Sequence, residues 1–133
     1  MMRSFVVAYF ACALVFLGLD GVWIGLIAKS FYVWALGSLM RDRPLLVALA
    51  FYLIDAVGIV VFAVEPALSH GFARAALLGA LYGFCAYATY DLTNLATLRG
   101  FPPKLAFLDI AWGACVTAVA ALVGFHAARW TLR

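Results

Sequence analysis

Charged side chains are scarce in this chain of 133 residues. Lys, Arg, Asp and Glu together make up 11% of it, whereas hydrophobic residues make up 68%. A soluble domain is typically about a quarter charged and about half apolar, and a chain this short has too little interior to bury such an excess. The composition excludes most classes of soluble enzyme. It predicts an all-α integral membrane protein with a single domain over residues 1–133.

Histidine is also rare, and the cysteines do not form pairs in the sequence. This limits the catalytic and metal-binding chemistry that the chain can support. His70 and His126 lie near the ends of apolar segments, and Cys12, Cys85 and Cys115 stand apart with no CxxC or Cys/His spacing. We interpret the cysteines as small buried side chains rather than metal ligands or a disulfide framework. The sequence shows no Ser/Cys–His pair, His cluster or nucleotide-binding loop. We therefore expect no cofactor and no metal site. The same absences favour a non-enzymatic protein over an enzyme.

The positive charge is small and dispersed. The net charge is +3, and the basic residues are spread along the chain instead of forming a patch, so we expect no nucleic-acid partner. With four spans, one side of the membrane carries Arg3, Arg74, Arg129 and Arg133. The other side carries Lys29, Arg41, Arg43, Arg99 and Lys104. This near-even split only weakly favours periplasmic termini, and it is compatible with dual topology.

Four apolar segments are long enough for a helix to cross a bilayer core of ~30 Å. They cover about Phe5–Ala28, Leu45–Val64, Ala75–Leu98 and Leu105–Phe125. Joined by short connections, they predict an up-down-up-down bundle of four transmembrane helices. The first connection, Lys29–Pro44, is rich in aromatic residues. It either forms a short helix at the membrane interface or prolongs the first span.

The few acidic residues are the most informative feature. Four of the six fall one per span, at Asp20, Asp55, Asp91 and Asp109. An ionisable side chain inside a membrane costs a few kcal/mol, so it normally faces the bundle interior and has a partner or a function. A rise of ~1.5 Å per residue places Asp20, Asp91 and Asp109 roughly 8–12 Å from the side that bears the first and third connections. Asp55 lies deeper, roughly 16 Å from that side.

Hydrogen-bond donors accompany these carboxylates. Trp23 follows Asp20 by one helical turn, Trp112 follows Asp109, and Tyr52 precedes Asp55. In the third span, one face carries Tyr87, Tyr90, Asn94 and Thr97, with Asp91 at its edge. Indole and phenol groups can donate hydrogen bonds to a carboxylate. The predicted ligand-binding residues are Asp20, Trp23, Asp55, Tyr90, Asp91, Thr93, Asn94, Asp109 and Trp112.

Two glycine pairs have the spacing that lets transmembrane helices approach closely. Gly21 and Gly25 form one in the first span, and Gly79 and Gly83 form another in the third. Small residues four positions apart allow two backbones to touch. Such spacings are common in membrane sequences, so they permit close helix contacts without specifying them.

Two interpretations of the acidic residues stay open. They can be structural, fixing the bundle through interhelical hydrogen bonds of about 0.6–2 kcal/mol each. They can also form a polar site that binds or transports a proton, a cation or a polar head group. An accessory enzyme of membrane lipid metabolism, with Asp91 or Asp109 as general acid or base, is an alternative. A structural subunit of a larger membrane complex is another. The expected partners are membrane lipid and either a second copy of the chain or other membrane-protein subunits.

Two motifs give the chain a family resemblance. The stretch Tyr90-Asp91-Leu92-Thr93-Asn94-Leu95-Ala96-Thr97-Leu98 is followed by Asp109-Ile110-Ala111-Trp112-Gly113 at the start of the next span. These motifs resemble the bacterial predicted membrane proteins grouped as domain of unknown function 2177. The likeness covers nearly the whole chain, including the Asp20…Trp23 and Tyr52…Gly58 segments. The resemblance implies a small four-helix protein of the bacterial inner membrane with no established activity.

Overall fold

The computed structural model of the chain describes residues 1–40 and 45–133, and the regular structure of this part is helical throughout. The helices are α1 (Met2–Val22), α2 (Lys29–Leu36), α3 (Leu45–Ile59), α4 (Glu65–Ala67), α5 (Phe72–Thr97) and α6 (Pro103–Thr131). A π-helical turn over Trp23–Ile27 prolongs α1, and a second one over Val60–Val64 joins α3 to α4. A 3₁₀ turn over Gly37–Leu39 follows α2.

Four of these helical stretches are long and apolar enough to cross a membrane. They cover Met2–Ile27, Leu45–Ala67, Phe72–Thr97 and Pro103–Thr131. The prediction of a helical membrane protein with four spans is confirmed. The last helix runs beyond the predicted Phe125 because hydropathy marks the apolar stretch, whereas the hydrogen-bonded helix continues through Arg129 into Thr131.

The segment after the first span forms a separate helix. Ala28 interrupts the helical backbone with φ −98° and ψ 1°, and α2 then ends at Gly37, whose φ is +48°. The alternative that this segment prolongs the first span is therefore wrong. Phe31 and Tyr32 of α2 pack against a cluster that contains Leu105 near the start of α6. The end of the predicted connection, residues 41–44 with two of the counted arginines, lies outside the described residues.

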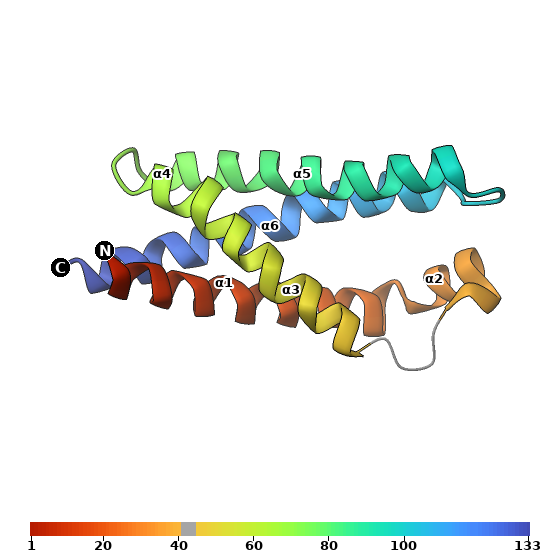
Figure 1. Cartoon of the computed structure of the whole chain (residues 1–133), viewed down its shortest axis with the longest axis horizontal. Coiled ribbons are helices and arrows are strands. Elements are labelled where there is room, and N and C mark those ends of the chain that lie inside the picture. The colour runs from red at the N-terminus through yellow and green to blue at the C-terminus, as the bar shows by residue number, and fades with distance from the viewer. Residues whose placement is uncertain (41–44) are drawn as a thin grey trace.

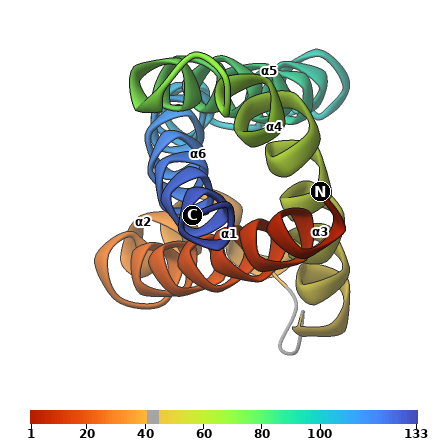
Figure 2. The same ribbon diagram turned by 90° about the vertical axis from the view of Figure 1, so that its left-hand side faces the viewer.

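Helix α6 packs against two neighbouring helices, α1 and α5. Figure 1 shows α5 and α6 running side by side, and the end view in Figure 2 shows α6 between α5 and α1. Both termini and the turn between α4 and α5 lie at one end of the ribbon. At the other end lie α2 and the connection between α5 and α6. We call this second end the α2 end.

Small residues permit these close contacts. A Cβ atom added at Gly83 of α5 would lie 2.3 Å from the carbonyl oxygen of Gly113 in α6. One added at Gly124 would lie 2.3 Å from Sγ of Cys12 in α1. Side chains at either glycine would push the helices apart, so the glycines set the spacing of α6 from both neighbours.

The buried residues of α3 lie toward its C-terminal end. Ile59 is buried in the core, as are Val60 and Val64 in the π-helical turn that follows. The first half, from Leu45 to Ile54, has no buried residue. Figure 1 shows α3 crossing the bundle obliquely and leaving α5 toward its own N-terminus. As a result, α3 and α5 diverge toward the α2 end.

One of the two glycine pairs makes no contact with another described helix, and the interpretation of the cysteines as buried is wrong at two positions. Nothing lies within 4 Å of a Cβ added at Gly21 or Gly25, because these positions of the first span face away from the other described helices. Cys85 and Cys115 are exposed on the bundle surface, and Cys12 is buried. A membrane protein tolerates small apolar side chains on its lipid-facing surface, so their apolar sequence surroundings do not indicate burial inside the protein.

Candidate functional site

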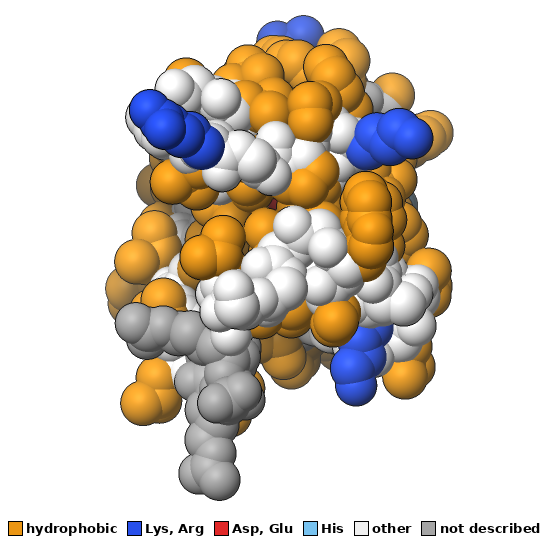
Figure 3. Space-filling view, turned by 90° about the vertical axis from the view of Figure 1, so that its right-hand side faces the viewer, with side chains coloured by type: hydrophobic (Ala, Val, Ile, Leu, Met, Phe, Trp, Pro, Cys, Tyr) orange, Lys and Arg blue, Asp and Glu red, His pale blue; other side chains and the backbone are white. Residues whose placement is uncertain are grey.

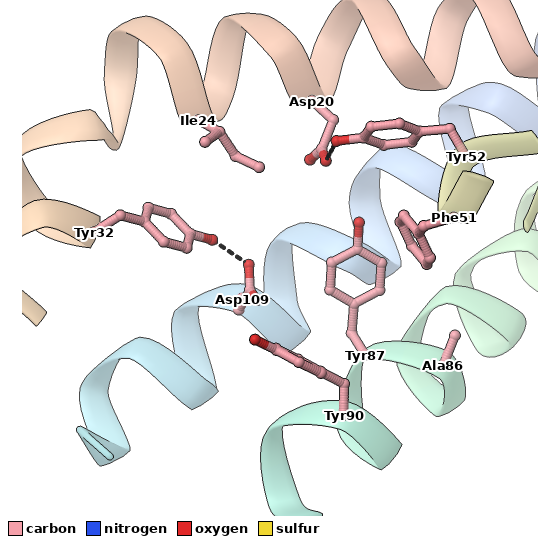
Figure 4. A pocket seen from close by; sticks show the side chains of 9 residues that line it. All are labelled: Asp20, Ile24, Tyr32, Phe51, Tyr52, Ala86, Tyr87, Tyr90 and Asp109. Carbon is pink, nitrogen blue, oxygen red and sulfur yellow. Dashed lines mark hydrogen bonds between the residues drawn. The ribbon is translucent and has the colours of Figure 1, made fainter. Parts of the chain in front are cut away.

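A cavity of about 420 Å³ opens between α1, α2, α3, α5 and α6. Figure 4 shows side chains from all of these helices converging on it. Its lining combines two carboxylates, four phenols and three apolar side chains. These residues are Asp20, Ile24, Tyr32, Phe51, Tyr52, Ala86, Tyr87, Tyr90 and Asp109. The volume falls within the range of ligand-binding pockets, roughly 300–1,000 Å³.

Asp20, near the end of α1, is held by two other spans. Its Oδ1 accepts a hydrogen bond of 2.7 Å from Nε1 of Trp112 in α6. Its Oδ2 accepts one from the hydroxyl of Tyr52 in α3. Trp23 stacks on Trp112 with ring centroids 4.4 Å apart and planes 8° from parallel. Both oxygens of this buried carboxylate are therefore used by the protein itself.

Asp109, in the second turn of α6, keeps one oxygen free. The hydroxyl of Tyr32 in α2 donates a hydrogen bond to its Oδ1, and Figure 4 shows the carboxylate pointing into the cavity. Within the described part of the chain, its Oδ2 has no hydrogen-bond partner, although the residue is only 9% exposed. Burial raises the pKa of Tyr32, and the adjacent charge of Asp109 raises it further. Tyr32 therefore remains a protonated donor at neutral pH.

The charge distribution changes between the cavity and its rim. Among the residues described, the lining contains two carboxylates and no Lys, Arg or His. Lys29, Arg99 and Lys104 are exposed at the α2 end, where the chain enters α2, leaves α5 and begins α6. Figure 3 looks onto this end and shows blue basic side chains around its edge and almost no red acidic surface. A negatively charged interior therefore lies beneath a positively charged rim.

The structure brings some of the predicted site residues together and leaves others apart. Asp20, Tyr90 and Asp109 line the cavity, and Trp112 and Trp23 lie behind Asp20. The remaining predicted residues, Asp55, Asp91, Thr93 and Asn94, do not belong to the lining.

The four remaining residues have different surroundings. Asp55 is buried in α3 beside Tyr82, with one oxygen that has no partner in the described chain. Asp91 is 0% exposed, and neither of its oxygens has a partner there. Thr93 is exposed, and Asn94 is half-buried.

The partners expected from sequence neighbours are wrong at two positions. Tyr52 bonds Asp20 of α1, and not Asp55 one turn away on its own helix. Trp112 also bonds Asp20, and not Asp109 one turn earlier. Residues three or four apart lie on one helical face, but both donors face the space between helices, where a carboxylate of another span is the nearer acceptor.

Sequence reasoning missed several lining residues. Ile24 belongs to the π-helical turn after α1, an irregularity that the hydropathy pattern does not reveal. Tyr32 lies in the connection assigned to the membrane interface. The aromatic content of that connection was the available signal. Tyr87 was placed on the polar face of the third span, beside Tyr90, and this face was the clue to its role.

Possible metal ligands are dispersed. In residues 1–40 and 45–133, no group of three or more His, Cys, Asp or Glu side chains could hold a metal ion. The chemistry of the cavity is therefore that of carboxylates and phenols surrounded by apolar walls.

These features define a helical multi-pass membrane protein with an acidic, aromatic cavity near one end. The chain belongs to the family described as Predicted membrane protein (DUF2177), whose model matches residues 5–126. The resemblance drawn from the YDLTNLATL and DIAWG motifs is thus confirmed. Neither a curated protein nor a solved structure matches the chain.

Proposed function

We propose that the chain is a small binding module of the bacterial inner membrane whose cavity takes a cationic group. The observation that carries this proposal is Asp109. Its carboxylate points into the cavity, and its Oδ2 accepts no hydrogen bond from a described residue. Asp20 adds a second carboxylate to the lining, and no described basic side chain lines the cavity to neutralise them.

The aromatic lining supports a cation rather than a neutral ligand. Tyr87 and Tyr90 extend from α5 toward the two carboxylates in Figure 4. The face of an aromatic ring attracts a cation, by about 0.5–2 kcal/mol depending on how far the cation is desolvated. The attraction between a carboxylate and a cation is also stronger in the low dielectric of a membrane protein than in water. Carboxylates and ring faces together suit an organic ammonium group.

The two carboxylates have different tasks under this proposal. Asp20 uses both oxygens to hold α3 and α6, which fits the structural interpretation of intramembrane acids. Asp109 uses one oxygen to hold Tyr32 and offers the other to a ligand. We therefore expect Asp109 to dominate binding and Asp20 to dominate the stability of the cavity wall.

A pair of matched probes tests the proposal. The purified protein in nanodiscs of phosphatidylglycerol would be titrated with 2-phenylethylammonium and with 2-phenylethanol, which has the same ring and no charge. Tryptophan fluorescence would report binding, since Trp23 and Trp112 lie behind Asp20. We expect the ammonium compound to bind at least about tenfold more tightly, because removing one partner of a buried charge pair costs about 2–5 kcal/mol.

Two carboxamide variants complete the test. Asp109→Asn removes the free carboxylate and should abolish the preference for the ammonium probe. Glu65→Gln makes the same chemical change outside the cavity lining and should leave binding unchanged. Equal affinity for the two probes, or an unaltered preference in Asp109→Asn, would rule out a cation-binding cavity.

A further inference from the structure

We propose, building on the cation-binding function, that the natural occupant is a membrane lipid whose head group carries a primary ammonium and a phosphate, as in phosphatidylethanolamine. The ammonium enters the cavity, the phosphate stays at the basic rim of the α2 end, and the acyl chains remain in the bilayer. Three separate features of the structure support the three parts of this ligand.

The ammonium part follows from the free oxygen of Asp109. Oδ2 accepts no hydrogen bond from a described residue, and the carboxylate faces the cavity. A primary ammonium has three N–H donors and can supply the missing hydrogen bond. A quaternary choline group has no N–H donor, so it would leave Oδ2 unsatisfied. The site should therefore prefer ethanolamine to choline head groups.

The phosphate part follows from the basic residues above the cavity. Lys104 precedes Asp109 by five positions in α6, which places its backbone about 7.5 Å closer to the α2 end. Lys29 and Arg99 are exposed at the same end. An ethanolamine head group separates its ammonium from its phosphate by only two carbons. An ammonium beside Asp109 thus places the phosphate between the acidic cavity and these cations.

The acyl part follows from the exposed side chains that α3 and α5 contribute to the cavity. Phe51 of α3 and Tyr90 of α5 both line the cavity, and they are 43% and 57% exposed. Figure 1 shows α3 diverging from α5 toward the α2 end. In a membrane, this surface faces lipid. A head group can therefore enter sideways while its chains stay in the bilayer, a route that a water-soluble amine does not need.

The experiment measures lipid preference directly. Native mass spectrometry would be applied to the detergent-solubilised full chain, mixed with equal amounts of dioleoyl phosphatidylethanolamine, phosphatidylcholine and phosphatidylglycerol. We expect ethanolamine-lipid adducts to exceed glycerol-lipid adducts at least about tenfold and choline-lipid adducts several-fold. Free O-phosphoethanolamine in large excess should not displace the bound lipid, which separates a lipid from a soluble ligand with the same head group.

Substitutions test which residue binds each part of the lipid. Asp109→Asn should remove the preference for phosphatidylethanolamine, whereas Asp109→Glu, which keeps a carboxylate, should retain part of it and so distinguish ligand loss from misfolding. Lys104→Gln should weaken ethanolamine-lipid binding several-fold without affecting 2-phenylethylammonium. Glu65→Gln should change neither.

The possible failures have different meanings. If 2-phenylethylammonium binds and the three lipids bind equally, the lipid assignment is wrong and the cation-binding cavity stands. If phosphoethanolamine competes with the lipid, the occupant is a soluble amine. If neither the ammonium probe nor the lipid shows a preference that depends on Asp109, both proposals are overturned.

Discussion

Trp112 donates a hydrogen bond of 2.7 Å to Asp20, a residue 92 positions earlier in the chain. Because Tyr52 bonds the other oxygen, this single carboxylate connects α1, α3 and α6. No residue of α3 from Leu45 to Ile54 is buried, and this stretch is held by the bond to Asp20 together with a hydrogen bond from the Tyr9 hydroxyl to the Leu53 carbonyl oxygen and ring contacts with Phe16. The Asp20 cluster, defined as Asp20, Tyr52 and Trp112, therefore positions the α3 wall of the cavity.

The first prediction tests this cluster. Trp112→Phe keeps an aromatic ring against Trp23 but removes the N–H that Asp20 accepts. Hydrogen bonds between membrane helices contribute about 0.6–1.7 kcal/mol, and leaving a buried acceptor unpaired adds to the loss. We expect the unfolding free energy to fall by about 1–2 kcal/mol in a denaturing-detergent titration. Trp130→Phe, at a side chain that is 76% exposed, should change it little. Equal effects of the two substitutions would show that the indole hydrogen bond does not stabilise the fold.

The same cluster shows how far the sequence determines the site. Hydropathy located the four spans, and the cost of burying charge placed Asp20 and Asp109 inside the bundle, near one end. The partners of these carboxylates depend on how each helix is rotated about its axis and on the oblique path of α3. Neither is encoded in residue spacing within one span. Tyr52 and Trp112 were therefore recognised as donors but assigned to the wrong acceptors.

The glycine pairs show the same limit. Gly21 with Gly25 and Gly79 with Gly83 have identical spacing, yet only the second pair touches another helix. The spacing permits close approach, and the position of the neighbouring helix decides whether it occurs. In α5, the neighbour is α6, whose own Gly113 meets Gly83. In the first span, the glycines face away from the other described helices.

The second prediction follows from this difference. Gly83→Ala would place a Cβ atom 2.3 Å from the Gly113 carbonyl oxygen and 2.5 Å from Oγ1 of Thr117, so α5 and α6 must separate. Overpacking of this kind typically costs about 1–3 kcal/mol. Gly21→Ala meets open space, and we expect it to be neutral or slightly stabilising because alanine favours the helix. Unfolding in mixed detergent micelles would compare the two. If Gly83→Ala is as stable as the wild type, the contact between α5 and α6 is looser than the structure shows.

The third prediction compares two buried carboxyl groups. Asp91 is fully buried and unpartnered in the described chain, whereas Asp20 has two donors. Asp91→Ala removes an unsatisfied polar group and improves helix propensity, so we expect the free energy of unfolding to rise by about 1 kcal/mol. Asp20→Ala leaves the Tyr52 hydroxyl and the Trp112 N–H unpaired and should lower it by about 2–3 kcal/mol. A loss of stability in Asp91→Ala as large as that in Asp20→Ala would show that Asp91 has a stabilising partner.

The last prediction concerns the pH dependence of Tyr32, which lies outside the four spans. Its folded-state pKa is raised by burial and by Asp109, whereas the phenol of an unfolded chain titrates near pH 10, roughly its unperturbed value. Above this pH, the unfolded chain binds fewer protons than the folded one, so the unfolding free energy decreases as pH rises. The stabilisation due to Tyr32 is therefore complete below about pH 10 and is progressively lost above it.

Tyr32→Phe removes this titration together with the hydrogen bond to Asp109. The variant should be less stable than the wild type by about 1 kcal/mol at pH 7, and the difference should shrink above about pH 10, vanish before about pH 11 and reverse at higher pH as the wild type loses its advantage. Chemical unfolding of both proteins across this pH range measures how steeply the free energy of unfolding of each protein changes with pH. In an Asp109→Asn background, the slopes should lie closer together, because the carboxylate that opposes ionisation of Tyr32 is gone. Parallel slopes in the wild-type background would mean that Tyr32 is not buried against Asp109 in the folded protein, and the α2 wall of the cavity would then be open.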